Sequence, residues 1–435
     1  MKSIRVGFIN SSGSYNADPF RNQPLTIIYL LTYLEKYFGE KLELSLIDLR
    51  GLPENEFVSH IPENDIFLYT LTTLDFNEAE RLVQKLRDIY PIAKHISGGP
   101  HITLFPQDGE RVFDAIALGE GENSIIELFN DIFNSELKPI YRQGPLSDLQ
   151  TIPIPSRKWL PKSSVVIQGL LNKEYLKHNG TSTLFSRGCP FDCHFCSNLE
   201  KGSVRYMPYE TITQEIEYLK REYGVNALAL KDDNGIPVGR KFARPWLEAI
   251  GKADIKWRGQ SRATGVTEDM VILAKDSGCA EIAVGLETIT PKSMDLLNKP
   301  LNLTEAKKYL LTLQKHGIGI RIHIIVGLPG EPENVVDSTL KFCDEFGVNS
   351  VLLSLLTPLP GTAMYNNPNS FGMKNITKNW DDFRVAFGSF DANEKPKMTF
   401  EYEKETPWGK GKSSEEIIDD YMILQEAFRE GSRKF

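Results

Sequence analysis

The sequence has no long hydrophobic run and no excess of positive charge. Its most apolar helix candidate, residues 25–34, extends for about ten residues, whereas a membrane span requires roughly 20. Lys2, Arg5 and Asn10 interrupt the start of the chain, so no secretory signal is expected there. A formal net charge of −8 gives no general attraction to nucleic acid or to an anionic membrane. We therefore expect a cytoplasmic protein that acts on a small molecule or a peptide, with no nucleic-acid or membrane partner.

Cysteine is scarce, and its distribution is uneven. The 435 residues include five cysteines, and Cys189, Cys193 and Cys196 lie close together in one short segment. An odd and sparse set of this kind does not predict a disulfide framework. Cys279 and Cys343 stand alone in apolar contexts, and we interpret them as buried, inert thiols. Any cysteine chemistry is therefore expected at the three clustered residues.

The chain is too long for one ordinary domain, and its first part has an alternating α/β pattern. Short β-rich segments alternate with helical periods, which indicates parallel strands joined by helical crossovers. We predict a doubly wound, Rossmann-like domain in residues 1–141. Its strands are expected at residues 3–10, 42–50, 66–72, 95–99 and 115–119, and its helices at residues 24–38, 77–90 and 122–133.

The second part of the chain repeats this alternation without a return strand. Residues 142–180 contain several prolines and little periodicity, so we interpret them as a linker. Residues 181–363 are predicted to form a partial (β/α)6 barrel, which would place its site at the C-terminal ends of the strands. Residues 364–435 are predicted to be a C-terminal extension that covers part of the barrel mouth. The barrel strands are expected at residues 181–187, 227–232, 256–262, 281–287, 319–327 and 350–357.

The clustered cysteines follow the first predicted barrel strand directly. Their spacing, Cys-x3-Cys-x2-Cys, lets three thiolates reach three corners of a cubane cluster, and no fourth cysteine lies nearby. One iron would then lack a protein ligand and could serve as the reactive coordination site. A structural zinc site is the alternative. It usually needs four ligands, and His194 lies too tightly between Cys193 and Cys196 for the usual pair spacing.

This cysteine segment, after the first strand of a partial barrel, resembles that of the radical S-adenosylmethionine superfamily. The resemblance implies one [4Fe–4S] cluster on Cys189, Cys193 and Cys196, whose open iron is chelated by the methionine part of S-adenosylmethionine. It also implies cleavage of the sulfonium to a 5′-deoxyadenosyl radical, with an external electron donor such as flavodoxin or ferredoxin. Phe195 matches the aromatic position that in this family lies against the adenine.

Three more barrel segments resemble the cofactor-contact segments of this family. Arg262 offers a cation for the carboxylate of S-adenosylmethionine, and Glu287 an acceptor for its ammonium or ribose hydroxyls. Gly327 would leave room for close backbone approach. Arginine and glutamate at strand ends often simply pair with each other, and that interpretation stays open. The segments are residues 257–262, 284–287 and 325–331.

One segment departs from the family pattern. Many relatives have Gly-Gly-Glu at the end of the second barrel strand to hold the methionine ammonium, whereas this chain has Lys231-Asp-Asp-Asn234. Asp232 or Asp233 can accept the same hydrogen bonds, and relatives that depend on cobalamin commonly have acidic residues here. The sequence does not decide between the two aspartates.

Residues 97–103 and 114–122 resemble the cobalamin-binding domain that precedes many radical barrels. Glycines after parallel strands let the backbone approach a flat ring or a nucleotide tail at the edge where doubly wound sheets bind ligands. The lower axial motif Asp-x-His-x-x-Gly is absent, so we expect either cobalamin without a histidine on cobalt or a degenerate scaffold. The residues that the resemblance assigns to cobalamin are Thr72, Gly98, Gly99, Pro100, Gly119, Glu120 and Gly121.

The resemblance implies methyl transfer to an unactivated carbon of a small molecule or peptide. One S-adenosylmethionine would methylate cobalamin, and a second would give the radical that prepares the substrate carbon. The alternative is a radical dehydratase, epimerase or rearrangement enzyme with a vestigial cobalamin domain. Methylthiotransfer would need an additional cluster, which an N-terminal domain without cysteine cannot supply. A non-catalytic redox or scaffold protein would need no open iron.

We predict that Cys189→Ala, Cys193→Ala or Cys196→Ala each abolishes cluster binding, because each removes one iron ligand. Cys279→Ser and Cys343→Ser are the matched controls and should leave the cluster iron unchanged. Iron and sulfide analysis of anaerobically reconstituted protein measures both outcomes. A full cubane retained without Cys193 would overturn the assignment.

Overall fold

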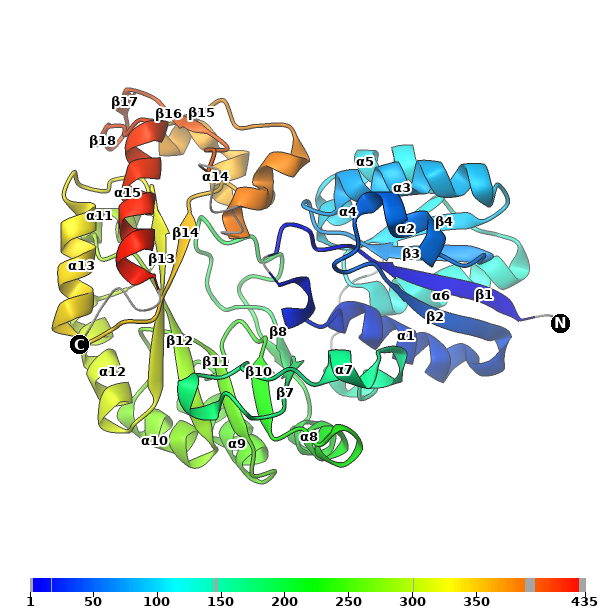
Figure 1. Ribbon diagram of the computed structural model, residues 1–435, viewed down its shortest axis with the longest axis horizontal. Coiled ribbons are helices and arrows are strands. Elements are labelled where there is room, and N and C mark those ends of the chain that lie inside the picture. Colours follow the sequence, from blue (N-terminus) through cyan, green and yellow to red (C-terminus); the bar gives the residue numbers. More distant parts are fainter. Residues whose placement is uncertain are drawn as a thin grey trace. The chain divides into compact units, whose positions relative to one another are not determined.

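The computed structural model describes residues 3–429 except 17, 143, 145–147, 300 and 388–395. The chain divides into two compact units, Met1–Val165 and Val166–Phe435, and each contains a six-stranded parallel sheet (Figure 1). The predicted fold class, a Rossmann-like sheet followed by a partial barrel, is confirmed. Within the described residues, no helix has the length and apolar character needed to cross a membrane.

Sheet A forms the centre of the first unit. Its strands are β1 Ile4–Asn10, β2 Leu42–Asp48, β3 Ile66–Thr70, β4 Lys94–Gly98, β5 Ala115–Leu118 and β6 Ile140–Arg142. They pair in the order β2-β1-β3-β4-β5-β6, and every pair is parallel. This order places a topological switch point between β1 and β3, and ligands of such sheets bind at the C-terminal ends of the strands. Strand β6 was not predicted.

Helices cover both faces of sheet A (Figure 1). They are α1 Leu25–Phe38, α2 Phe57–His60, α3 Phe76–Ile89, α4 Pro100–Leu104, α5 Pro106–Val112, α6 Gly121–Asn134 and α7 Lys162–Val165. Apolar residues of α1 and α6, such as Leu31 and Phe129, share one buried cluster with Val6 and Leu68 of the sheet. Because both faces are covered, β1, β3 and β5 contain consecutive apolar residues, whereas the edge strand β2 alternates.

The first unit also includes part of the predicted linker. The Ser156 backbone N–H donates to Thr32 Oγ1 of α1 at 3.0 Å, and Gln23 Nε2 donates to the Val165 carbonyl at 2.7 Å. The described residues from 148 to Val165 therefore belong to the first compact unit, where they contact α1 and the segment before it. The linker residues 143 and 145–147, and residues 388–395 and 430–435 of the predicted extension, lie outside the described part.

Sheet B forms the half-barrel of the second unit. Its strands are β7 Gly180–Thr183, β10 Ala227–Leu230, β11 Lys256–Arg262, β12 Cys279–Glu287, β13 Gly319–Val326 and β14 Val351–Leu355. They follow one another in chain order across the sheet, all parallel, as six successive βα units require. The helices that connect them are α8 Tyr209–Tyr223, α9 Arg240–Gly251, α10 Glu268–Asp276, α11 Pro291–Leu296, α12 Leu303–Lys315 and α13 Val335–Glu345.

Alternate side chains of sheet B face these helices. Thr183 Oγ1 donates to Glu215 of α8 at 2.7 Å, and the hydroxyl groups of Ser261 and Tyr309 of α12 lie 2.9 Å apart. Successive side chains of a strand point to opposite faces, so the neighbours of Ser261 face the inside of the half-barrel. Residues 166–176 pack at the lower end, where Leu170 and Leu171 contact Ala227 and Ala229.

The first barrel strand is shorter than predicted. Residues 181–187 were expected as one strand, but β7 ends at Thr183. Ser186 and Arg187 form a separate strand, β8 Ser186–Arg187, which pairs antiparallel with β9 Arg205–Tyr206. The cysteine segment therefore follows β8, not the barrel strand. The chain leaves the sheet because Asp232 accepts hydrogen bonds from Phe185 and Ser186.

The C-terminal extension packs against the C-terminal end of β13. It contains α14 Ala363–Asn366, β15 Met373–Lys374, β16 Glu401–Tyr402, β17 Glu405–Thr406, β18 Gly409–Lys410 and α15 Ser414–Phe428. A capping box of Ser413 and Glu416 begins α15. The Tyr402 hydroxyl donates to the Gly327 carbonyl at 2.8 Å, and Ile417 of α15 lies against Gly327. These contacts fix the extension over the end of that strand.

We predict that Gly99→Ala destabilises the first unit strongly. Gly99 has a φ of 98°, and an added Cβ would lie 2.6 Å from the Leu71 backbone nitrogen, which cannot move aside. Gly39→Ala is the control, since Gly39 also has a positive φ but nothing within 4 Å of an added Cβ. Urea unfolding should show a loss of about 3 kcal/mol or more for Gly99→Ala and about 1–2 kcal/mol for Gly39→Ala. Equal losses would contradict the steric argument.

Candidate active site

Backbone hydrogen bonds join the two ends of the cysteine loop. The Cys189 backbone N–H donates to the Glu200 carbonyl at 3.0 Å, and the Gly202 N–H donates to the Cys189 carbonyl at 2.8 Å. Gly188 has a φ of 92°, and a Cβ there would collide with the Ser203 carbonyl. Only glycine permits this closure without strain. The loop is therefore held at its base independently of any bound group.

Polar groups from neighbouring strand ends reach two of the three thiols. Asn234 Nδ2 lies 3.7 Å from Cys189 Sγ, and Arg262 Nη1 lies 3.6 Å from Cys193 Sγ. Cys193 is buried, whereas Cys189 and Cys196 are partly exposed. Burial raises the pKa of the Cys196 thiol, so iron binding must replace its proton. Hydrogen-bond donors near the sulfur atoms would stabilise thiolates and tune a bound cluster.

The donor set fits an iron–sulfur cluster better than a zinc ion. A structural zinc site usually needs four ligands that converge on one point at about 2.3 Å from sulfur, whereas this loop offers three thiols. A cubane instead binds each thiolate at a different iron. His194 serves the loop itself, because its Nδ1 bonds the Leu296 carbonyl at 2.8 Å and its N–H the Leu297 carbonyl at 2.9 Å.

Arg262 is a buried cation with spare hydrogen-bond donors. It ends β11 and is 9% exposed. Its guanidinium lies 3.7 Å from the centre of the Phe191 ring, within the cysteine loop. Among the described residues, its Nε and Nη2 have no hydrogen-bond partner. Unsatisfied buried donors of a charged group each cost about 1–3 kcal/mol, so this geometry suits a ligand carboxylate.

Glu287 pairs with a lysine that the sequence did not reveal. It ends β12 with a φ of 67°, where the register with β13 shifts. Its Oε1 lies 3.3 Å from Lys299 Nζ, and both side chains are largely buried. The same Nζ lies 5.6 Å from the centre of the Phe195 ring. Glu287 and Phe195 are thus brought together through Lys299, and the simple pair of Arg262 with Glu287 is not among the ion pairs of the described residues.

Asp232 and Asp233 have different surroundings. Asp232 is fully buried and accepts hydrogen bonds from the Phe185 N–H at 3.0 Å and the Ser186 hydroxyl at 2.6 Å. Burial raises its pKa to about 7, and these two hydrogen bonds oppose that rise. Asp233 is exposed, and its Oδ2 accepts from Asn198 Nδ2 at 2.6 Å. Asp232 therefore anchors the segment before the cysteines, while Asp233 faces the side of the loop that follows Cys196.

Gly327 has neighbours other than those expected from the sequence. Its φ is 90°, and an added Cβ would lie 2.6 Å from Ile417 Cγ2. Its N–H donates to Glu331 Oε2 at 3.0 Å. Burial raises the pKa of Glu331 to about 7. The space beside Gly327 is therefore occupied by the C-terminal extension, which gives this glycine a packing role.

Comparisons with known proteins agree with this geometry. Residues 183–343 match the family model of the Radical SAM superfamily. The chain carries a radical SAM domain. An uncharacterized methyltransferase of Pyrococcus horikoshii is 27% identical over 378 residues, which are 80% of this chain and 80% of that protein. Bacteriochlorophyllide d C-12(1)-methyltransferase of Chlorobaculum tepidum is 24% identical over 424 residues, which are 94% of this chain and 83% of that protein.

The fold has a counterpart among solved structures. The radical S-adenosylmethionine methyltransferase TsrM of Kitasatospora setae superposes with a TM-score of 0.68 at 16% identity, over 93% of this chain and 88% of that chain. The cobalamin-dependent S-adenosylmethionine radical enzyme OxsB superposes with a TM-score of 0.64 at 16% identity, over 85% of this chain and 56% of that chain. The radical S-adenosylmethionine prediction is confirmed for residues 183–343.

The first unit contains the candidate cobalamin residues, and they lie at one edge of sheet A. They follow β3, β4 and β5, which are neighbours in the sheet. Gly98 and Gly99 are already packed by Ala117 and Leu71, so internal packing by itself explains why both are glycine. Thr72 Oγ1 donates to Asp75 at 2.6 Å. Pro100 starts α4, Gly119 has a φ of 85°, Glu120 caps α6, and Gly121 lies against Leu30.

No described histidine of the first unit is poised at this edge as a metal ligand. His95 is fully buried and its Nδ1 lies 3.0 Å from the Tyr69 hydroxyl. His101 is fully buried between Thr73 and Asp108, at 3.2 and 3.4 Å. His60 bonds the Glu56 carbonyl within its own helix at 2.9 Å. Cobalamin could be accepted here through the backbone of the strand-end loops, without imidazole.

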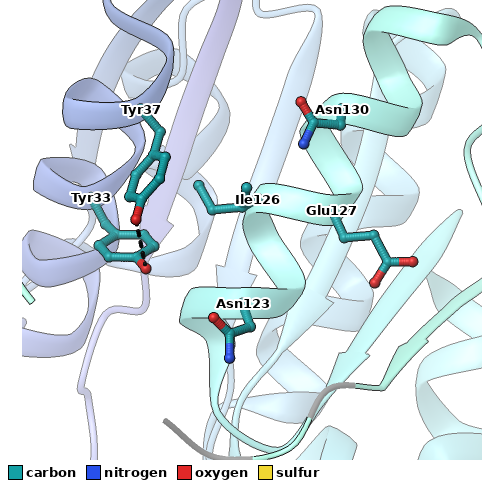
Figure 2. A pocket seen from close by; sticks show the side chains of 6 residues that line it. All are labelled: Tyr33, Tyr37, Asn123, Ile126, Glu127 and Asn130. Atoms are coloured by element: carbon teal, nitrogen blue, oxygen red, sulfur yellow. Dashed lines mark hydrogen bonds between the residues drawn. The ribbon is translucent and has the colours of Figure 1, made fainter. Parts of the chain in front are cut away.

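One pocket of the first unit lies away from these residues. It is a groove of about 490 Å³ between α1 and α6 (Figure 2). The hydroxyl groups of Tyr33 and Tyr37 lie 3.4 Å apart at one side of it. None of the residues assigned to a cofactor lines this groove. The lining residues are Tyr33, Tyr37, Asn123, Ile126, Glu127 and Asn130.

We predict that the two aspartates differ in function. Asp232→Ala should prevent cluster loading, because the segment before the cysteines loses its anchor, whereas Asp232→Asn keeps an acceptor and should load iron. Asp233→Ala should load iron but bind S-adenosylmethionine about tenfold more weakly, since a charge-assisted hydrogen bond contributes about 1.5–3 kcal/mol. Iron analysis and equilibrium dialysis measure these effects. Full loading of Asp232→Ala, or unchanged affinity of Asp233→Ala, would contradict the division of roles.

Proposed function

We propose that this chain is a radical S-adenosylmethionine enzyme that transfers a methyl group to an unactivated carbon and depends on cobalamin. The observation that carries the proposal is the cysteine loop with Arg262, whose Nη1 lies 3.6 Å from Cys193 Sγ. The buried Nε and Nη2 of this guanidinium have no hydrogen-bond partner among the described residues. Relatives named methyltransferases match along most of both chains, and this supports the choice of reaction.

Different side chains of the radical SAM domain would bind the cluster and the charged groups of S-adenosylmethionine. Cys189, Cys193 and Cys196 would hold the cluster. When bound, the cluster and S-adenosylmethionine would supply a carbon-centred radical that removes a substrate hydrogen, and cobalamin would supply the methyl group. The free Nε and Nη2 of Arg262 would bind the cofactor carboxylate. Asp233 would accept from its ammonium.

Glu287 and Lys299 would form the other wall of the cofactor site. The Lys299 ammonium neutralises Glu287, so the carboxylate is held in place without bearing an unpaired charge. Glu287 keeps a second oxygen with which to accept ribose hydroxyls. Phe195 would offer its ring to the adenine, and Lys299 near that ring would limit how far it can turn. This arrangement orients the cofactor through contacts made before any reaction begins.

The first unit supplies the argument for cobalamin. Thr72, Gly98, Gly99 and Gly119 lie at the ligand-binding edge of a doubly wound sheet. TsrM and OxsB, which share this fold over most of the chain, were solved with cobalamin bound. We propose the same cofactor here, bound without a histidine on cobalt. An external one-electron donor such as flavodoxin or ferredoxin would reduce the cluster.

A second function remains a candidate because some relatives have another name. An anaerobic magnesium-protoporphyrin IX monomethyl ester cyclase of Rubrivivax gelatinosus is 24% identical over 378 residues, 79% of this chain and 65% of that protein. A radical enzyme that closes a ring or rearranges its substrate would use the same barrel. It would form 5′-deoxyadenosine without transferring a methyl group.

We expect protein reconstituted anaerobically with iron, sulfide and cobalamin to form both 5′-deoxyadenosine and S-adenosylhomocysteine from S-adenosylmethionine and dithionite. Liquid chromatography with mass spectrometry measures both products, and Cys193→Ala is the inactive control. The electron paramagnetic resonance spectrum of the cob(II)alamin form should show no nitrogen superhyperfine splitting, because the three histidines of the first unit bond groups of the protein itself.

Two results would change this assignment. Absence of 5′-deoxyadenosine in fully loaded protein would reject radical chemistry. Formation of 5′-deoxyadenosine without S-adenosylhomocysteine, in protein that retains no cobalamin, would favour the second function and a vestigial first unit. A triplet splitting from an axial nitrogen would contradict the predicted ligation of cobalt.

A further inference from the structure

The inner face of the half-barrel is accessible, while its outer face is sealed by helices. Along β13, Ile322, Ile324 and Val326 are buried, whereas Arg321 and His323 are only partly buried. Strands β11 and β12 alternate in the same way along their upper halves. Since Ser261 faces α12 and successive residues alternate, the accessible set points inward. Any substrate of this barrel would meet these inward side chains.

The inward side chains of β11 lie in a row that begins at the cofactor site and continues toward the N-terminal end of the strand. Arg262 reaches the cysteine loop, and Gln260 lies two residues below it, about 7 Å along the strand. Gln260 is exposed, and its amide makes no hydrogen bond among the described residues. A group next to the cofactor can therefore contact Gln260 directly.

Small residues separate Gln260 from the next inward side chains. In register across the sheet, Gln260 pairs with Ala283 of β12, and Ala283 pairs with Arg321 of β13. Neighbouring strands lie about 4.8 Å apart, so the α-carbons of Gln260 and Arg321 are about 10 Å apart with only a methyl group between them. One level higher, Arg262, Gly285 and His323 pair in the same way.

Arg321 lies at the lower end of this face, beside Arg258 and Glu281. Glu281 Oε1 lies 3.7 Å from Arg258 Nη1 and 3.6 Å from Arg321 Nη2, so two guanidinium groups share one carboxylate. Arg321 Nε bonds Ser350 Oγ at 3.1 Å, which fixes the direction of its side chain. The Arg321 side chain is nevertheless 30% exposed. A ligand carboxylate or phosphate could bind the exposed part of this guanidinium.

Leu352 gives the β14 edge of the inner face an exposed apolar side chain. Leu352 of β14 pairs in register with His323 and is 49% exposed. Burial lowers the pKa of His323 below its ordinary value, so its imidazole is neutral near pH 7. Leu352 would contact a hydrocarbon part of a ligand, and the exposed apolar surface would gain about 25 cal/mol for each Å² removed from water.

We propose that this inner face, formed by Gln260, Ala283, Arg321, His323 and Leu352, binds a substrate with an anionic end group and an apolar body. The anion, a carboxylate or a phosphate, pairs with Arg321 and accepts from the Gln260 amide. The apolar body lies toward Leu352, which leaves a carbon free to face the cofactor above. This inference rests on the proposed function and names the substrate class of the same site.

Binding of simple probes to the anaerobically reconstituted holoenzyme tests this inference. Octanoate and octyl phosphate carry the two anions, and 1-octanol is the neutral control. Calorimetric titration should show that one of the anions binds at least about tenfold more tightly than 1-octanol, as one charge-assisted contact predicts. The preferred anion distinguishes a carboxylic acid substrate from a phosphate ester.

Two variants locate the binding. Arg321→Gln should weaken binding of the preferred anion about tenfold, while the cluster iron content stays at the wild-type level and shows that the variant folds. Gln260→Met changes an exposed side chain and should therefore leave folding intact. This variant should bind the preferred anion about threefold more weakly. Arg240→Gln, on the outer helix α9 with a 63% exposed side chain, is the matched charge control and should change nothing.

The inference is overturned if 1-octanol binds as well as both anions, or if the Arg321 and Gln260 variants bind the preferred anion like the wild type. It is also overturned if neither anion binds to protein that forms 5′-deoxyadenosine, and the proposed function then stands. Selective anion binding to protein that forms no 5′-deoxyadenosine would support the binding face and reject the radical function.

Discussion

The active-site half of this protein depends on one buried carboxylate. Asp232 accepts hydrogen bonds from Phe185 and Ser186, and these bonds end the first barrel strand and turn the chain out of the sheet. The cysteine loop then lies near the ends of the neighbouring strands. There Asn234 lies close to the Cys189 sulfur and Arg262 lies close to the Cys193 sulfur. An acceptor buried without these donors would cost about 1–3 kcal/mol, so the turn and the carboxylate require each other. The family pattern assigns this region to the cofactor, whereas here one of its two acidic residues serves the loop.

In sheet B, the outward side chains pack against helices and the inward side chains form the candidate site. Outward residues such as Ser261 and Ile322 contact helices, so their burial holds the half-barrel together. Inward residues contact few partners, which leaves charged groups at both ends of the sheet, Arg262 near the cysteines and Arg321 near Glu281. The strand period of two thus lets a single sequence segment stabilise the fold and line a site.

Different glycines of this chain are required for different physical reasons. Gly188 is required because the cysteine loop closes tightly, and Gly99 because the Leu71 backbone lies against it. Gly327 accommodates Ile417 from a helix far along the sequence. A glycine after a strand therefore indicates close approach, and the approaching group can be the protein itself.

Much of the fold and the centre of the site could be predicted from the sequence. Periodicity located the strands, with β11 at residues 256–262 as expected, because strand and helix periods are local properties. The cysteine spacing predicted the cluster loop, since ligand spacing within one segment is also local. Lys299, by contrast, is recognisable only once it lies 3.3 Å from Glu287. The separate roles of Asp232 and Asp233, the partner of Gly327 and the pairing of Gln260 with Ala283 and Arg321 were likewise decided by tertiary structure. Each depends on which residues of distant segments meet, and strand register and side-chain direction fix that only when the chain is folded.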